Sequence, residues 1–164
     1  MTTGPRLLFT AFPDAQVKAA MWSGHAEILS GSPTRNFRLP TSPFTVWQLV
    51  TANGRAVARA TNSFSSFDEA NLDARRVVRE VASIRIELAT HAMTGMHGWS
   101  ARLGDECVAV CSRWYTNERD CRNAAALALQ SLPIARIATS AHVVRLFRGT
   151  STEPLVLPVR RLEA

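Results

Sequence analysis

The sequence predicts an α+β protein built from two tandem copies of a strand–turn–strand–helix–strand unit. Three observations predict this class. Two stretches of strand-like residues each contain a tight turn, and a capped helical pattern follows each of them. The second stretch then repeats the first, which indicates a duplicated unit. The chain has 164 residues, of which 46% are apolar, so it can form the core of one ordinary domain.

An N-terminal extension, residues 1–43, precedes the repeats. Arg6 to Phe12 has the pattern of a short strand. Asp14 to Leu29 fits either a helix or two strands, because Gly24 interrupts the helical spacing. Ser30 to Pro43 contains three prolines and is expected to be a loop or an extended connector.

Repeat one, residues 44–92, begins with a predicted strand from Phe44 to Thr51. Asn53-Gly54 favours a type I′ hairpin turn, because both central residues of that turn need positive φ. The return strand is Ala56 to Thr61, and Ser66 with Glu69 forms a capping box for a helix. Ile84 to Leu88 then alternates apolar and charged residues, as a half-buried strand does.

Repeat two, residues 93–147, follows the same order. Its expected elements are a strand Gly98 to Leu103, a turn at Gly104-Asp105, a return strand Cys107 to Ser112, a helix from Asn117 to about Leu132 and a last strand His142 to Phe147. Residues 124–129 are apolar on all sides, so we expect this helix to be the more buried of the two. A C-terminal segment, residues 148–164, contains a possible short edge strand from Leu155 to Val159, limited by Pro158.

The two repeats align at a shift of 51 residues after the turn, which matches Val57 to Val108 and Ser66 to Asn117. Before the turn a shift of 52 matches Trp47 to Trp99, although 53 also fits there. Tryptophans at equivalent strand positions favour packing in the core, or on the second face of the sheet, over stacking on bases.

These repeats resemble the small YegP-like (DUF1508) family of uncharacterised proteins. The residues that carry the resemblance are Leu49 to Gly54, Ala56 to Ala58 and Ser63 to Ser66, and in the second copy Gly104-Asp105, Val108-Ala109, Ser112, Tyr115 and Asn117. The resemblance implies tandem β-β-β-α-β repeats that form one antiparallel sheet with two helices packed on one face. It also implies that the repeats exchange their last strands, here Ile84 to Leu88 and His142 to Phe147. It implies no activity. The arginine-rich repeats and the extension 1–43 depart from the family pattern.

The sequence offers no catalytic or metal constellation, and no cofactor is predicted. Cys107 and Cys111 lie about 13 Å apart on one predicted strand, too far for a disulfide. His91 and His97 flank Met93 and Met96, a mixture that could hold copper, but a solvated loop explains them better. No nucleophile with a neighbouring base and no phosphate-binding glycine loop is present, so an enzyme is the least favoured interpretation.

Arginine carries the clearest functional signal. The net charge is +6, with Lys18 as the single lysine, and the excess lies outside residues 44–135, in which ten arginines nearly balance nine acidic residues. Arginine suits phosphate contacts because its planar guanidinium donates in pairs. Acidic residues on the same helix face favour ordinary solvation instead. The candidate nucleic-acid or partner-binding residues are Arg75, Arg76, Arg79, Arg145, Arg148, Arg160 and Arg161.

The first functional hypothesis is a non-catalytic module that binds RNA, DNA or an acidic partner through these arginines. The second is a structural or protein-interaction subunit that docks through residues 1–43 or an edge strand, or forms a homodimer. The third is an enzyme of unknown reaction. No apolar run reaches the ~18 residues of a membrane span, and the N-terminus lacks a signal-peptide pattern, so a cytoplasmic protein without membrane contact is expected.

Overall fold

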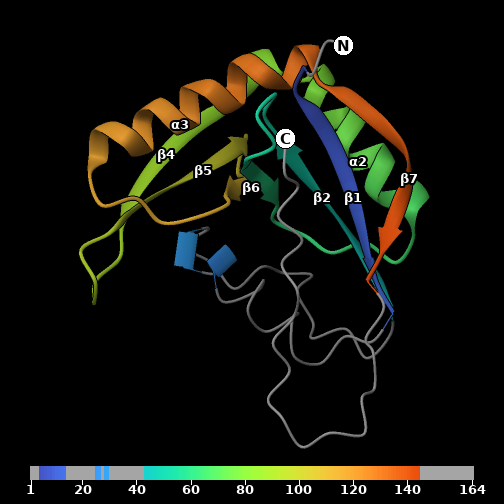
Figure 1. Ribbon diagram of the computed structural model, residues 1–164. Helices are drawn as coiled ribbons and strands as arrows, with labels where there is room; N and C mark the ends of the chain where they lie inside the picture. The colour runs from blue at the N-terminus through green and yellow to red at the C-terminus, as the bar shows by residue number, and fades with distance from the viewer. Residues whose placement is uncertain (1–3, 14–24, 27, 30–42, 145–164) are drawn as a thin grey trace, which may run out of the picture.

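The computed structural model describes residues 4–13, 25–26, 28–29 and 43–144 (Figure 1). In this part of the chain a seven-stranded sheet is covered by two α-helices. Short 3-10 turns, Val81–Ser83 and Leu132–Ile134, follow the helices. The elements are β1 (Arg6–Phe12), β2 (Phe44–Val50), β3 (Ala56–Ala60), α2 (Phe67–Arg79), β4 (Arg85–Thr90), β5 (His97–Leu103), β6 (Glu106–Cys111), α3 (Glu118–Ser131) and β7 (Arg136–Val143).

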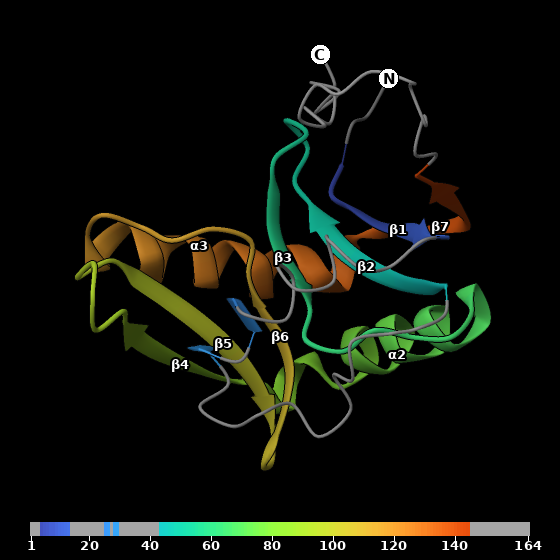
Figure 2. The ribbon, with the colours of Figure 1, turned by 90° about the horizontal axis from the view of Figure 1, so that it is seen from below.

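The strands run in the order β4-β5-β6-β3-β2-β1-β7. Neighbouring strands are antiparallel except β1 and β7, which are parallel, so the sheet is mixed rather than wholly antiparallel. The α+β class, the single sheet and the two helices are as predicted. The parallel pair arises because β1, from the N-terminal extension, lies between β2 and β7. Figure 2 shows α2 along the β1–β2 side of the sheet and α3 along the β4–β5 side.

Two halves of the sheet have equivalent pairing, half one from β2 to β4 and half two from β5 to β7. Each is a β-β-α-β unit, with two strands before the helix instead of three. Leu49 pairs with Ala58 as Ala101 pairs with Ala109, and both ladders shift register at the next residue. The halves meet where Arg59 of half one pairs with Val110 of half two, and the shift of 51 makes these two residues equivalent to each other. They are therefore related by an approximate two-fold axis through this pair.

The last strands lie on the opposite half, as the resemblance implied for strand exchange. β4 pairs with β5, and β7 lies beyond β1 on the side of half one. The bounds predicted for the second of these strands, His142 to Phe147, are wrong: the strand is Arg136–Val143, and Arg145 to Phe147 lie outside the described residues. β7 is a half-exposed edge strand that includes Thr139 and Ser140, so its apolar alternation is too weak to mark it.

Both predicted helix caps are confirmed. The Ser66 hydroxyl accepts a hydrogen bond from the Glu69 amide at 3.2 Å, and the Asn117 side chain accepts one from the Asp120 amide at 2.8 Å. The Glu69 carboxylate accepts from the amide and hydroxyl of Ser65, one residue before the expected partner. These contacts satisfy amides that a helix N-terminus leaves without partners.

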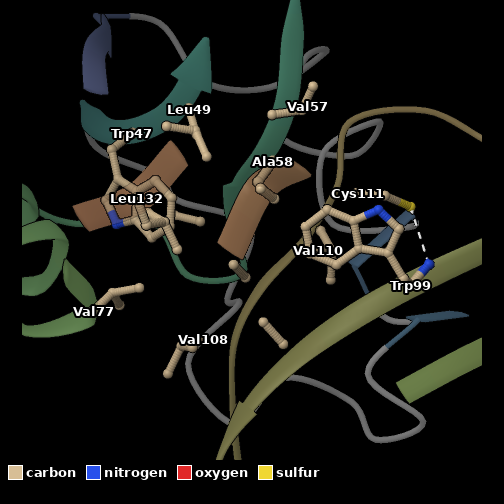
Figure 3. Packing of buried hydrophobic residues seen from close by; sticks show 14 of the residues in the cluster. Trp47, Leu49, Val57, Ala58, Val77, Trp99, Val108, Val110, Cys111 and Leu132 are labelled. Atoms are coloured by element: carbon tan, nitrogen blue, oxygen red, sulfur yellow. Dashed lines mark hydrogen bonds between the residues drawn. The ribbon is translucent and has the colours of Figure 1, made fainter. Parts of the chain in front are cut away.

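Trp47 and Trp99 are fully buried and lie at opposite sides of the cluster in Figure 3. Each helix buries one stripe against the sheet. For α2 the buried residues are Ala70, Ala74 and Val77, and for α3 they are Cys121, Ala125, Ala128 and Ser131. The apolar run in α3 is thus not enclosed on all sides, because Leu127 is 43% exposed. This face of α3 points away from the sheet, where nothing in the described chain covers it.

A short piece of the N-terminal extension also packs against the chain. His25, Ala26, Ile28 and Leu29 are helical, which favours the helix alternative for that end of the segment, and Ala26 and Leu29 are buried. The sheet residue Gly98 lies directly beneath Leu29. A Cβ atom added at Gly98 would lie 2.5 Å from Leu29 Cδ2. The remainder of Asp14 to Leu29, Ser30 to Ser42 and Leu155 to Val159 lie outside the described residues.

No helix in the described ranges is both long and apolar enough to cross a membrane.

Candidate anion-binding surface

One of the predicted binding residues, Arg76, is part of an internal ionic network. Trp47 Nε1 donates to Asp73 Oδ2 at 2.8 Å, and Arg76 donates to Asp73 Oδ1 at 3.0 Å. Arg76 also makes a bidentate pair with Glu106, at 2.8 and 2.9 Å. Hydrogen bonding to Glu106 raises the pKa of Arg76, and the same pair lowers the pKa of Glu106. The network ties α2 to the β5–β6 hairpin, so Arg76 has a structural role.

The other predicted arginines of α2 lie on its exposed outer face. Arg75 donates from Nε to the Asn71 side chain at 3.2 Å, one helical turn earlier, and Arg79 is exposed in the last turn. Both guanidinium groups remain accessible to an anionic partner. The remaining candidates, Arg145, Arg148, Arg160 and Arg161, lie outside the described residues.

Arg6 and Arg136 form a pair of cations that the sequence did not suggest. They are direct partners in the parallel β1–β7 ladder, where the Arg136 amide donates to Pro5 O at 2.9 Å. Adjacent strands lie about 4.8 Å apart and side chains of paired residues leave the sheet on the same face. Two like charges in such a position repel each other and destabilise the sheet. This repulsion would be relieved by an anion bound between the guanidinium groups.

The ion pairs in the described part of the chain leave both arginines out. The acidic residues Asp73, Glu87, Glu106 and Glu118 pair instead with other arginines, namely Arg76, Arg85, Arg102 and Arg122. Nε of Arg6 is buried and has no hydrogen-bond partner in the structure. A buried donor without a partner is costly, which indicates a position that a ligand or water completes.

Only the strand order could reveal this pair. Arg6 and Arg136 are 130 residues apart in the chain, and parallel pairing of the first and last strands is not visible in any local pattern. One signal was available for Arg136: the shift of 51 maps the start of the strand at Arg85 onto Arg136. Extending the alignment that far would have placed Arg136 at a strand start.

The thiols and histidines of the described chain do not gather into a metal-binding group. Burial raises the pKa of Cys107 and Cys111, and of Cys121 to about 11, so none is an activated thiolate at neutral pH. His91 Nδ1 accepts hydrogen bonds from the Met93 and Thr94 amides, as in an ordinary turn. The described residues hold no group of three or more His, Cys, Asp or Glu that could bind a metal ion.

His25 anchors the N-terminal piece to the sheet. Its Nε2–H donates to Cys111 O at 2.6 Å, and its ring meets the edge of Trp114 at a centroid distance of 5.2 Å. Burial, and then the charge of Arg59, lower the pKa of His25 from 6.5 to about 4, although the hydrogen bond to Cys111 opposes the shift. The imidazole is therefore neutral in the folded protein at pH 7.

This shift predicts that the protein loses stability in mild acid. Between pH 6.5 and 4 the unfolded chain binds a proton at His25 that the folded chain does not bind, so stability falls as the pH falls through this window. For a partly buried group we expect a loss of about 1–2 kcal/mol. Urea unfolding at pH 7 and pH 5 measures it. His25→Gln should flatten the dependence, whereas the exposed control His142→Gln should retain it; equal slopes in both variants would contradict the assignment.

Comparisons of the chain with protein-family models, curated proteins and solved structures found no match. The similarity to the YegP-like family therefore stays a prediction from the sequence.

Proposed function

We propose that the protein is a non-catalytic binding module for nucleic acid, in which Arg6 and Arg136 contact the phosphate backbone. The juxtaposition of these two arginines on adjacent strands carries the proposal. Two arginines that are paired on strands about 4.8 Å apart can direct their guanidinium groups to a single phosphate, and arginine forms such paired contacts better than lysine.

The distribution of charge supports an anionic partner. Four acidic residues of the described chain, Asp73, Glu87, Glu106 and Glu118, pair with other arginines, whereas Arg6, Arg136, Arg75 and Arg79 take part in none of the described ion pairs. The whole chain carries a net charge of +6, which favours association with polyanions. Because Trp47 and Trp99 are buried, these two aromatics are not a stacking platform for bases. We therefore expect binding to depend on backbone charge more than on base sequence.

Docking by strand addition has less support. The edge strand β4 carries Arg85 and Glu87, and charged residues discourage pairing with another strand. The opposite edge strand, β7, is irregular, because its register against β1 shifts between Leu7 and Phe9. Such irregularities also protect edges. Of the N-terminal extension, Ala26 and Leu29 are buried within the chain itself.

We expect Arg6→Gln/Arg136→Gln to weaken binding of a fluorescein-labelled single-stranded RNA or DNA of 20 nucleotides by about tenfold or more, because each arginine makes charge-assisted contacts. Fluorescence anisotropy at low salt measures this. Arg122→Gln is the matched control, since that exposed arginine already pairs with Glu118. Thermal unfolding should show the double variant to be as stable as the wild type or more so, because a repulsion has been removed.

Two results would count against the proposal. If the double variant binds both nucleic acids as tightly as the wild type does, this pair is not the contact. If poly-glutamate binds through Arg6 and Arg136 while neither nucleic acid binds, the partner is an acidic protein.

A further inference from the structure

The two halves differ at one corner, and this difference indicates a ligand. In half one, Asp73 lies between Trp47 and Arg76, and Arg76 continues to Glu106. The shifts of 52 and 51 place Trp99, Ala124 and Leu127 of half two, together with Arg55 from the β2–β3 hairpin of half one, at the equivalent positions. Half two thus keeps the indole, as Trp99, but has Ala124 in place of the Asp73 carboxylate that binds the indole of Trp47 in half one.

Trp99 has a donor without an acceptor as a result. Its side chain is 1% exposed, and its Nε1 atom is buried with no hydrogen-bond partner in the structure. The equivalent atom in Trp47 is satisfied by Asp73 at 2.8 Å. A buried indole N–H usually has a partner, and leaving one out costs free energy. The geometry of half one shows which chemical group satisfies this donor: a carboxylate oxygen.

The residues that the two-fold relation of the halves assigns to this corner have the charge and exposure that a carboxylate from outside would need. Arg55 is exposed at the base of the β2–β3 hairpin and takes part in none of the described ion pairs. It replaces the acidic Glu106, so the sign of the charge at the outer side of the corner is reversed. Leu127, which replaces Arg76, is 43% exposed, and Ala124 is half-buried. The corner therefore combines a buried donor, an apolar wall and a cation.

We infer that this corner of half two, formed by Trp99, Ala124, Leu127 and Arg55, binds the carboxylate of an aspartate or glutamate side chain from an acidic protein segment. One oxygen accepts from Trp99 Nε1, as Asp73 does for Trp47, and the other faces Arg55. This site is separate from the Arg6–Arg136 pair and takes a different class of ligand.

Indole N–H signals in a ¹⁵N-HSQC spectrum of the full chain test the site, with sodium acetate as the probe. The chain has four tryptophans, and Trp99→Phe identifies the Trp99 signal by its loss. We expect acetate to shift the Trp99 signal in a saturable manner and to leave the Trp47 signal in place, with sodium chloride at matched ionic strength as the control. Arg55→Gln should weaken the acetate effect by about tenfold, because a charge-assisted contact is lost.

Ala124→Asp should place a carboxylate inside the site permanently. We expect it to shift the Trp99 signal without acetate and to abolish the response to acetate, while nucleic-acid binding stays unchanged. The inference is overturned if acetate moves the Trp99 signal no more than chloride does, or if Arg55→Gln responds as the wild type does. It is also overturned if inorganic phosphate saturates the site as readily as acetate, since the corner would then be a general anion site.

Discussion

Asp73→Ala is expected to lower the free energy of unfolding by about 2–3 kcal/mol, because it removes the acceptor of a buried donor. The Asp73 side chain is only 12% exposed and accepts hydrogen bonds from both Trp47 and Arg76. Alanine would leave the Trp47 N–H buried without an acceptor. Arg76 would keep its bidentate pair with Glu106, so the loss should come mainly from the indole.

Urea unfolding at pH 7 measures the effect, with Asp68→Ala as the matched control on the same helix. Asp68 is exposed in the first turn of α2, and removing its interaction with the helix dipole should cost only about 0.5 kcal/mol. A second check is Trp47→Phe combined with Asp73→Ala, which should cost less than the sum of the single changes. Additive losses, or a loss for Asp73→Ala no larger than the control, would show that the pair does not stabilise the fold.

Gly98→Ala is expected to destabilise the protein by about 1–3 kcal/mol, although alanine suits a strand better than glycine does. The new Cβ would lie 2.5 Å from Leu29 Cδ2 and 2.7 Å from Trp114 Cζ3, and contacts this short force neighbouring groups to move. Leu29 is buried and Trp114 meets the rings of both His25 and His91, so neither side chain can move freely.

Thermal and urea unfolding compare this variant with Gly4→Ala, where an added Cβ has no atom within 4 Å and should change stability little. Leu29→Ala should partly rescue Gly98→Ala, because it removes one of the two obstructing side chains. If Gly98→Ala is as stable as Gly4→Ala, the helical piece around His25 does not lie on the sheet as described, and the expected pH dependence of His25 would lose its basis as well.

Local signals in the sequence predicted most of the fold. Asn53-Gly54 marked a hairpin, and Ser66 and Asn117 marked helix starts, because turns and caps depend on a few neighbouring residues. The type I′ turn expected at Asn53-Gly54 is wrong, because only Gly54 of these two residues has a positive φ, of 81°. The position of β1 between β2 and β7 was not predictable in this way. It depends on pairing between the two ends of the described chain, and no local pattern records which distant strand fills a sheet edge.

The candidate site, too, depends on contacts between distant parts of the chain that local sequence patterns do not record. Helical spacing placed Arg76 on the polar face of α2 correctly, but its partner Glu106 lies 30 residues away on a hairpin of the other half. The pattern of charges along the helix could not reveal that Arg76 already forms ion pairs within the protein. The like-charged pair of Arg6 and Arg136, and the donor of Trp99 left without an acceptor, likewise appear only when strands and halves are placed side by side.

The salt dependence of nucleic-acid affinity tests the central claim most directly. For the wild-type chain and a single-stranded RNA of 20 nucleotides, log Kobs should fall linearly with log salt concentration. The slope should be reduced by about 0.7 in Arg6→Gln/Arg136→Gln, since the two arginines share one phosphate and each neutralised phosphate of a single strand contributes about 0.7. Absence of binding at about 50 mM salt, or identical slopes for the wild type and the double variant, would contradict the proposed function.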